Sequence, residues 1–174
     1  MSRNLLLDRD GTICQRKHYL TRPEQIVLLP GVGEELRRAS MLDVKIFILT
    51  NQSAVGRGHL TLQGLSLVHE RLTSLLADFD VRVDDIFVCP HHPQEQCGCR
   101  KPRDGLFRQL TDRYSITPGD CVMVGDSPSD SGAAEAWGCR FVGVRGDLAP
   151  SHASKETWCS SSREAIRVAT DLLS

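Results

Sequence analysis

Short apolar runs alternate along the chain with longer segments in which apolar residues recur every three or four positions. Five of the runs have the length and composition of buried parallel strands. They cover residues 4–7, 44–49, 85–89, 121–124 and 140–144. The alternation predicts βαβ units, and hence an α/β fold with a parallel sheet and helices on both of its faces.

The segments between these runs predict helices. The clearest helix covers residues 62–79, where apolar side chains form one stripe and Thr61 stands in the N-cap position. The stripe consists of Leu62, Leu65, Val68, Leu72, Leu75, Leu76 and Phe79. Weaker stripes predict further helices over residues 32–42, 103–114, 129–137 and 162–173.

Length and charge narrow the class of protein. A chain of 174 residues is long enough to bury its own core, so we expect one domain over residues 1–174 that acts as a monomer. The formal net charge of −1 gives no electrostatic reason to expect a nucleic acid or an anionic membrane as partner. Because no apolar run approaches the roughly 20 residues that span a bilayer, and no signal peptide is evident, we expect a cytoplasmic protein.

Polar clusters follow four of the predicted strands. They read "DRDGT" from residue 8, "TNQS" from residue 50, "CPHH" from residue 89 and "GDSPSD" from residue 125. Asp8 and Asp10 point the same way on an extended chain end, so they repel each other unless a cation or a proton intervenes. A solvated turn explains one such cluster, but four at the carboxyl edge of one sheet predict a ligand site.

Three cysteines and a histidine crowd into eleven residues with the pattern C-x-H-x5-C-x-C. Cys89, His91, Cys97 and Cys99 would form a tetrahedral Zn²⁺ site that is closed to water and therefore structural. His92 is the rival nitrogen ligand. The other four cysteines, Cys14, Cys121, Cys139 and Cys159, are interpreted as small apolar residues.

Taken together, these motifs resemble those of phosphatases of the haloacid dehalogenase (HAD) superfamily. The resemblance implies a Rossmann-like three-layer fold with a central parallel sheet, a zinc-binding loop and no large cap domain. It also implies that Asp8 is the nucleophile that forms an aspartyl-phosphate, and that Asp10 is first the general acid and then the base. Asp126 would hold Mg²⁺ together with Asp8 and the main-chain carbonyl of Asp10.

The same resemblance implies roles for the residues around these acids. Thr50 would hydrogen-bond the transferring phosphoryl group, and Lys101 would neutralise its oxygens. Asp130 is expected to orient the site or to cap the following helix, with direct metal binding as the alternative. Further hydrogen bonds to the substrate are expected from the loop residues Asn51, Gln52 and Ser53.

The loop with the four predicted zinc ligands, residues 89–99, and the "CRKP" that begins at its last cysteine narrow the resemblance to the heptose bisphosphate and histidinol-phosphate phosphatases. This group implies removal of the 7-phosphate from D-glycero-D-manno-heptose 1,7-bisphosphate, a step toward nucleotide-activated heptose for lipopolysaccharide. The expected substrate loop is "QRKHY", with Arg16, Lys17, His18 and Tyr19. Arg16, Lys17 and Arg100 suit a second phosphate, which a sugar bisphosphate has and histidinol phosphate lacks.

Two departures from the heptose enzymes keep other substrates open. Ser127 stands where those enzymes usually have lysine, and the interval between His91 and Cys97 is shorter than in many of them. Histidinol phosphate or another small phosphate ester is the alternative substrate. A polynucleotide 3′-phosphatase is disfavoured by the neutral charge and the lack of aromatic clusters. A zinc-stabilised binding module is the non-enzymatic alternative, and metal-dependent turnover would exclude it.

Overall fold

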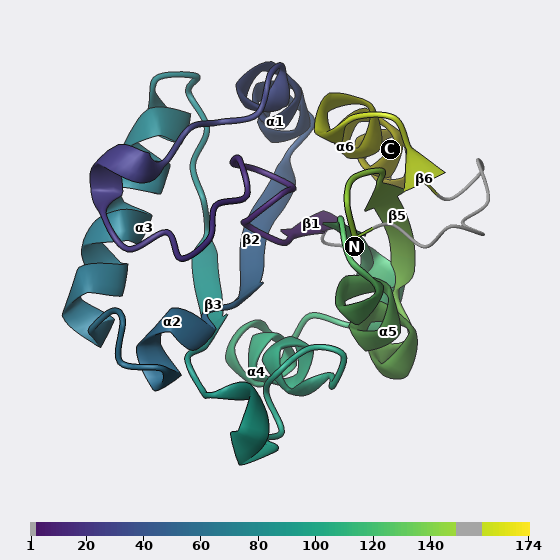
Figure 1. Ribbon diagram of the computed structural model, residues 1–174. Helices are drawn as coiled ribbons and strands as arrows, with labels where there is room; N and C mark the ends of the chain where they lie inside the picture. The colour runs from purple at the N-terminus through teal and green to yellow at the C-terminus, as the bar shows by residue number, and fades with distance from the viewer. Residues whose placement is uncertain (1–2, 149–157) are drawn as a thin grey trace.

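The computed structural model describes residues 3–148 and 158–174, and a six-stranded parallel sheet forms its centre (Figure 1). The strands are β1 (Arg3–Leu7), β2 (Val44–Asn51), β3 (Asp85–Cys89), β4 (Cys121–Gly125), β5 (Arg140–Val144) and β6 (Trp158–Cys159). The first five confirm the predicted strands. β6 was missed because two residues are too short for a hydrophobic pattern; it is fixed by pairing with Gly143 and Val144 of β5.

The end of β2 differs from the prediction. The strand continues through Thr50 and Asn51, which pair with Val88 and Cys89 of β3. Asn51, which was predicted to begin a loop, therefore lies in the strand. Ser53 then begins a short helix, α2 (Ser53–Gly56), which the sequence did not predict.

The five predicted helices are all present, with small shifts at their ends. They are α1 (Val32–Met41), α3 (Leu62–Ala77), α4 (Gly105–Tyr114), α5 (Pro128–Trp137) and α6 (Ser162–Leu173). Thr61 caps α3, because its side chain accepts a hydrogen bond from the Gly64 main chain. Three short 3₁₀ helices, η1 (Pro23–Gln25), η2 (Pro93–Glu95) and η3 (Pro118–Asp120), each begin with proline.

Side chains that alternate along the strands divide the core between two helical layers. Leu5 and Leu7 of β1 pack in a cluster with residues of α1, α3 and α6, whereas Leu6 packs in a second cluster with residues of α4 and α5. In Figure 1 the pair α1 and α6 accordingly lies opposite the pair α4 and α5. The predicted three-layer architecture is confirmed.

The strand order β3-β2-β1-β4-β5-β6 reverses direction between β1 and β4. In parallel sheets the crevice beyond the carboxyl ends at such a reversal is the usual ligand site. Residues 8–31, between β1 and α1, form only η1 and loops, so no cap domain is inserted there. None of the described helices is long and apolar enough to cross a membrane.

Candidate active site

Three carboxylates converge beyond the ends of β1 and β4. Asp8, Asp126 and Asp130 each place a carboxylate oxygen within 4.8 Å of the others, and all three residues are buried. The approach requires glycine at position 11, whose φ is +88° and where a Cβ would stand 1.9 Å from Asp126 Oδ2. Such a concentration of negative charge needs cations beside it.

Lys101 supplies one of these cations. Its Nζ donates hydrogen bonds to Asp8 Oδ1 at 2.8 Å and to the Leu49 carbonyl at 2.6 Å, and it lies 2.6 Å from Asp130 Oδ1. Burial lowers the pKa of Lys101, but the facing carboxylates of Asp130 and Asp8 outweigh it and raise that pKa above its usual value. The side chain is therefore a buried ammonium ion in contact with the predicted nucleophile.

Asp8 itself is strongly affected by its surroundings. Burial, with smaller contributions from the charges of Asp130 and Asp10, raises the pKa of Asp8 to about 7 against the attraction of Lys101. A carboxylate in this setting gains from any additional positive charge that approaches it. The phosphoryl-transfer chemistry predicted for Asp8 requires the ionised form.

Asn51 holds the main chain of Lys101 in place. Its Oδ1 accepts from the Lys101 amide nitrogen, and its Nδ2 donates to the Lys101 carbonyl, both at 3.1 Å. Asn51 therefore positions Lys101, in addition to lining the cavity described below. Thr50 is buried, and its Oγ1 accepts a hydrogen bond of 2.8 Å from Gln52 Nε2. The hydroxyl proton of Thr50 can thus be donated to a ligand.

The Asp10 carboxyl group accepts from three side chains, of which Cys14 Sγ, 3.6 Å from Oδ1, is the weakest donor. Arg9 donates from Nε to Asp10 Oδ1 at 3.1 Å and from Nη2 to Oδ2 at 2.8 Å, and Gln52 Nε2 also donates to Oδ2 at 2.8 Å. Gln52 Oε1 in turn accepts from Arg9 Nη2 at 2.8 Å. The sequence prediction gave Gln52 to the substrate and no role to Arg9. The sequence did offer a signal for Arg9, because an arginine between two acids at the end of a buried strand is well placed to pair with one of them.

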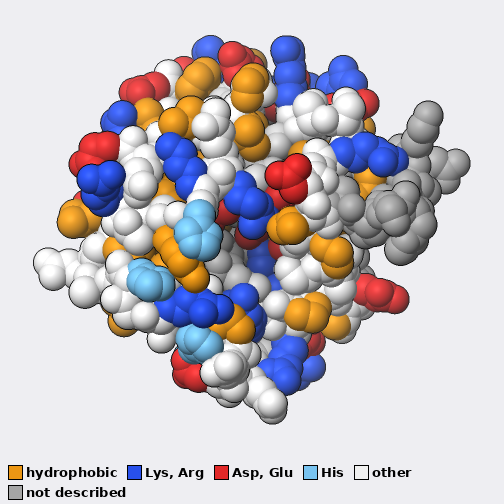
Figure 2. Space-filling model, viewed as in Figure 1, with side chains coloured by type: hydrophobic (Ala, Val, Ile, Leu, Met, Phe, Trp, Pro, Cys, Tyr) orange, Lys and Arg blue, Asp and Glu red, His pale blue; other side chains and the backbone are white. Residues whose placement is uncertain are grey.

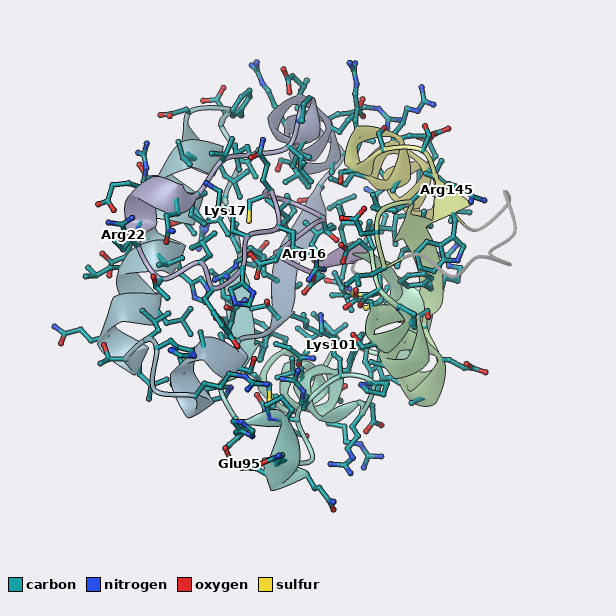
Figure 3. The ribbon with its side chains drawn as sticks, viewed as in Figure 1. Arg16, Lys17, Arg22, Glu95, Lys101 and Arg145 are labelled. Atoms are coloured by element: carbon teal, nitrogen blue, oxygen red, sulfur yellow. The ribbon has the colours of Figure 1, made fainter. Side chains whose placement is uncertain are left out.

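Arg16 pairs with Asp126 through a single nitrogen. Its Nη2 lies 2.8 Å from both Asp126 oxygens and donates to the Asp10 carbonyl at 2.9 Å. Figure 3 shows Arg16 and Lys101 near the centre of the site, whereas Arg22 and Glu95 lie at the periphery. Two of the three groups predicted to hold Mg²⁺ thus already attract a cation, so the donor set fits such an ion.

Asp130 links Lys101 to the start of α5. Its Oδ2 accepts from Ser127 Oγ at 2.7 Å and from the Ser127 main-chain nitrogen at 3.1 Å, which forms a capping box. Its other oxygen faces Lys101. Both expected contacts of Asp130, with the site and with the helix end, are present. Ser127, the departure from the heptose enzymes, serves in this helix cap.

A cavity of about 420 Å³ adjoins the site through Arg16, which pairs with Asp126, and Gln52, which bonds to Asp10. It brings together the predicted substrate loop and the residues at the end of β2. Its lining consists of Arg16, Lys17, His18, Tyr19, Leu20, Asn51, Gln52, Ser53 and Ala54. Figure 2 shows a hollow at the centre of this face, bordered by Lys, Arg and His side chains. Tyr19 has a positive φ of 53°, and its ring packs at a tilt against the rings of His18 and His59, with centroids 4.3 and 4.5 Å away.

Arg100 does not line this cavity. Its Nη1 atom is buried and has no hydrogen-bond partner in the part of the chain that the structure describes. A buried guanidinium nitrogen without an acceptor is costly. Arg100 is therefore suited to receive an anionic group of a ligand.

The four predicted zinc ligands form a compact cluster. Their sulfur and Nδ1 atoms lie 3.2–3.7 Å apart along four contacts. A tetrahedron with Zn–S bonds of about 2.3 Å has edges of about 3.8 Å, so the spacing fits zinc. Burial and the hydrogen bonds of Cys89 and Cys97 raise the pKa of Cys99 to about 12. The protonated thiol is therefore favoured without a metal, and a bound divalent cation would stabilise the thiolate instead.

His92 lies outside the Cys/His cluster. Its Nδ1 accepts from the Gln94 main chain at 3.1 Å, and its own main-chain nitrogen donates to Glu95 Oε1 at 2.6 Å. These bonds form a capping box at the start of η2. The rival ligand assignment to His92 is therefore disfavoured, and His91 Nδ1 faces the sulfurs as expected.

Comparison with known proteins places this geometry in a family. Residues 98–173 match the HAD-hydrolase-like family model. The D-glycero-β-D-manno-heptose-1,7-bisphosphate 7-phosphatase of Pseudomonas aeruginosa is 37% identical over 147 residues, which are 83% of each chain. The enzyme of the same name from Bordetella bronchiseptica is 35% identical over 136 residues, or 78% of this chain and 76% of that one. The chain belongs to this family of HAD-like phosphatases.

Solved structures agree with this membership. The D,D-heptose 1,7-bisphosphate phosphatase of B. bronchiseptica, in complex with magnesium and phosphate, superposes with a TM-score of 0.85 at 31% identity and covers 98% of both chains. A HAD-like phosphatase from Mesorhizobium loti superposes with a TM-score of 0.83 at 25% identity, over 99% of this chain and 87% of that one. As a member of the heptose bisphosphate phosphatase family, the protein is a phosphoric monoester hydrolase.

Proposed function

We propose that the protein removes the 7-phosphate of D-glycero-D-manno-heptose 1,7-bisphosphate and so acts in nucleotide-heptose synthesis. The observation that carries the proposal is the convergence of Asp8, Lys101, Asp126 and Asp130 beyond β1 and β4. The adjoining cavity has Arg16 and Lys17 in its lining. The named relatives catalyse this reaction and support the same substrate here.

In this mechanism an Asp8 oxygen attacks phosphorus while the bond to the sugar oxygen breaks. Asp10 gives its proton to the leaving alkoxide, so that the alcohol departs neutral and the phosphoryl group remains as an aspartyl-phosphate. Asp10, now ionised, then takes a proton from water, which attacks phosphorus and releases inorganic phosphate. Asp8 is restored as a carboxylate and Asp10 as an acid.

Lys101 and Thr50 act on the phosphoryl oxygens in both steps. The Lys101 ammonium is buried beside Asp8, so its charge faces the negative charge that the phosphoryl group carries. Gln52 donates to Thr50 Oγ1, so the hydroxyl proton of Thr50 is free to form a hydrogen bond to a phosphoryl oxygen. Asn51 keeps Lys101 at this position through its main chain.

The metal proposal follows from the donor atoms. Asp8, Asp126 and the Asp10 carbonyl offer the oxygen ligands that Mg²⁺ prefers, and the ion would relieve repulsion between Asp8 and an anionic substrate. Cys89, His91, Cys97 and Cys99 would hold a structural Zn²⁺. Because Cys99 precedes Lys101 by two residues, this zinc site would also restrain Lys101.

A second phosphate distinguishes the proposed substrate from histidinol phosphate. Lys17 and Arg16 line the cavity and are the first cations proposed for the non-reacting phosphate. Arg100 lies outside that lining, but its buried Nη1 has no hydrogen-bond partner among the described residues, so we propose that it adds a third cation when substrate binds. A substrate with one phosphate would leave this charge unused. We therefore keep histidinol phosphate only as the competing substrate in the test.

Phosphate release from the two substrates, measured side by side with Mg²⁺, tests the assignment. We expect a larger kcat/KM for heptose 1,7-bisphosphate, and we expect Arg100→Gln to reduce this preference by raising KM for the bisphosphate alone. If histidinol phosphate is the better substrate, the roles of Asp8 and Asp10 stand but those of Arg16, Lys17 and Arg100 do not. Absence of turnover on both would reject the proposed function.

A further inference from the structure

Arg9 is a buried cation whose polar atoms are almost all used. The residue is 1% exposed. Because arginine is seldom buried this deeply unless it is paired, its partners need to be identified. Its Nε and Nη2 bond to the two oxygens of Asp10, and Nη2 also donates to Gln52. The remaining nitrogen, Nη1, points away from Asp10 toward α3.

His69 of α3 is the partner of that nitrogen. The distance between Arg9 Nη1 and His69 Nε2 is 3.2 Å. A guanidinium group has only donors, so Nε2 must accept through its lone pair. The His69 ring is therefore neutral and carries its proton on Nδ1. Burial, and then the charge of Arg9, lowers the pKa of His69 to about 4, in agreement with this state.

The helix gives His69 a fixed place. Its neighbours Val68 and Leu72 on α3 are fully buried in the same core cluster as Leu5 and Leu7 of β1. The packing of α3 against the sheet therefore sets the height of the imidazole ring above the end of β1. Arg9 is in this way held from both sides, by an acceptor from α3 and by acceptors around the site.

We propose that His69 is a positioning residue of the reaction: its neutral imidazole fixes Arg9, and Arg9 with Gln52 fixes the carboxyl group of Asp10. This inference rests on the proposed role of Asp10 as general acid and base. Without the acceptor at position 69, Arg9 Nη1 becomes a buried donor with no partner and the guanidinium must turn toward another one. The Asp10 carboxyl group then loses its bidentate contact and its orientation.

The consequence falls on proton transfer to the leaving group. A sugar alkoxide needs the proton of Asp10, whereas p-nitrophenolate leaves with little help. We expect His69→Leu to lower kcat on the sugar phosphate by at least about tenfold, with KM little changed and a much smaller effect on p-nitrophenyl phosphate. His69→Gln, whose carbonyl oxygen can accept from Arg9, should retain most of the activity.

Controls separate positioning from damage to α3. Ser66→Leu places the same side chain on the exposed face of the same helix, and we expect wild-type kinetics on both substrates. An equal loss on both substrates in His69→Leu, or a His69→Gln enzyme as slow as His69→Leu, would overturn the inference. A wild-type enzyme that hydrolyses neither compound would instead reject the proposed function.

A measurement that needs no turnover tests the same contact. The ¹⁵N chemical shifts of the His69 ring should show a protonated Nδ1 and an unprotonated Nε2 near neutral pH. In Arg9→Met the ring loses its donor, and the Nε2 shift should move toward the value of a free imidazole. A charged ring, or a proton on Nε2, in the wild-type protein would overturn the role of His69.

Discussion

At the scale of single residues, the site depends on charges that neutralise one another at short range. Asp8 is buried and faces Lys101, while Asp126 faces Arg16. Burial raises the pKa of Asp126, and the hydrogen bond and charge of Arg16 oppose that rise. Lys101 thus serves Asp8 and Asp130 together, and Arg16 serves Asp126.

Asp8→Asn should abolish turnover and leave the fold intact. The amide has nearly the same shape as the carboxylate, but it cannot attack phosphorus, so we expect kcat to fall by more than about a thousandfold. Circular dichroism and thermal unfolding should resemble those of the wild type. Near-normal activity would show that another group is the nucleophile.

Arg16→Gln should strengthen the binding of Mg²⁺. The Arg16 guanidinium and a metal ion compete for the same Asp126 oxygens, so its removal should lower the Kd by about threefold or more. Calorimetric titration with MgCl₂ alone measures this without substrate. Lys17→Gln removes the same charge from the neighbouring residue and serves as the control. Unchanged or weaker Mg²⁺ binding in Arg16→Gln would contradict the expectation.

Sequence patterns predicted which acids would meet, but they did not predict what each amide does. Asp8 directly follows β1 and Asp126 directly follows β4, its neighbour in the parallel sheet, and this placement brings the two acids together. Asn51 and Gln52 were expected to contact substrate, yet they also bond to Lys101 and Asp10. Their partners come from distant loops, and no local pattern encodes such a pairing.

At the scale of elements, the loop that carries the four predicted zinc ligands connects β3 to Lys101. Cys89 is the last residue of β3, and Cys99 lies two residues before Lys101. Arg103 Nη1 donates to the Cys97 carbonyl at 2.6 Å, and the loop also packs against α4, because a Cβ on Gly105 would lie 2.3 Å from the Gly98 carbonyl. A loop held in one conformation would therefore also restrain the position of Lys101.

Cys97→Ser should lower the zinc content and reduce activity indirectly. With one thiolate lost, the loop holds the metal less tightly and Lys101 is positioned less well. Elemental analysis of the purified protein and kcat with Mg²⁺ measure the two effects. Cys159→Ser, far from the cluster in the sequence, is the control. If the purified protein contains no zinc and tolerates Cys97→Ser, the structural-metal proposal fails.

Elements with a strong period were predictable, and those set by tertiary pairing were not. The stripe from Leu65 to Leu76 and the Thr61 cap defined α3. The stripe did not indicate a role for His69, because a polar residue beside an apolar stripe is normally expected to face solvent. The extension of β2 to Asn51 depends on its pairing with Cys89, which the sequence of β2 does not contain.

At the scale of the whole molecule, burial of His69 links the active site to stability. The folded state favours the neutral ring, whose pKa is lowered to about 4 from a reference value of 6.5, mainly by burial and then by Arg9, with Asp10 opposing. The unfolded chain therefore binds a proton first as pH falls. The contribution of His69 to stability is complete above the reference value and is lost between that value and about 4.

The free energy of unfolding should thus fall more steeply in the wild type than in His69→Gln as the medium is acidified. Urea denaturation at about pH 7 and about pH 4.5 measures the two slopes. Carboxylates common to both proteins contribute equally and cancel in the comparison. Parallel curves would show that His69 titrates alike in the folded and unfolded chains.

Three expectations about the whole chain stay predictions. A single domain over residues 1–174, a monomeric state and a cytoplasmic location all came from length, charge and apolar runs. One continuous sheet and its two helical layers agree with the first of these for the described residues. Sedimentation analysis of the purified protein would test the predicted monomeric state.

The pairing of Arg16 with Asp126 has a consequence for the order of events in the life of the protein. Because the chain carries its own counter-ion for Asp126, the acids at its centre are partly neutralised as soon as the backbone closes. We therefore expect the newly made protein to fold while magnesium is scarce, and the proposed Mg²⁺ would have to displace the guanidinium from Asp126 when it binds. The proposed Zn²⁺ would act earlier, because its ligands would hold in place a loop with few apolar residues as the chain folds.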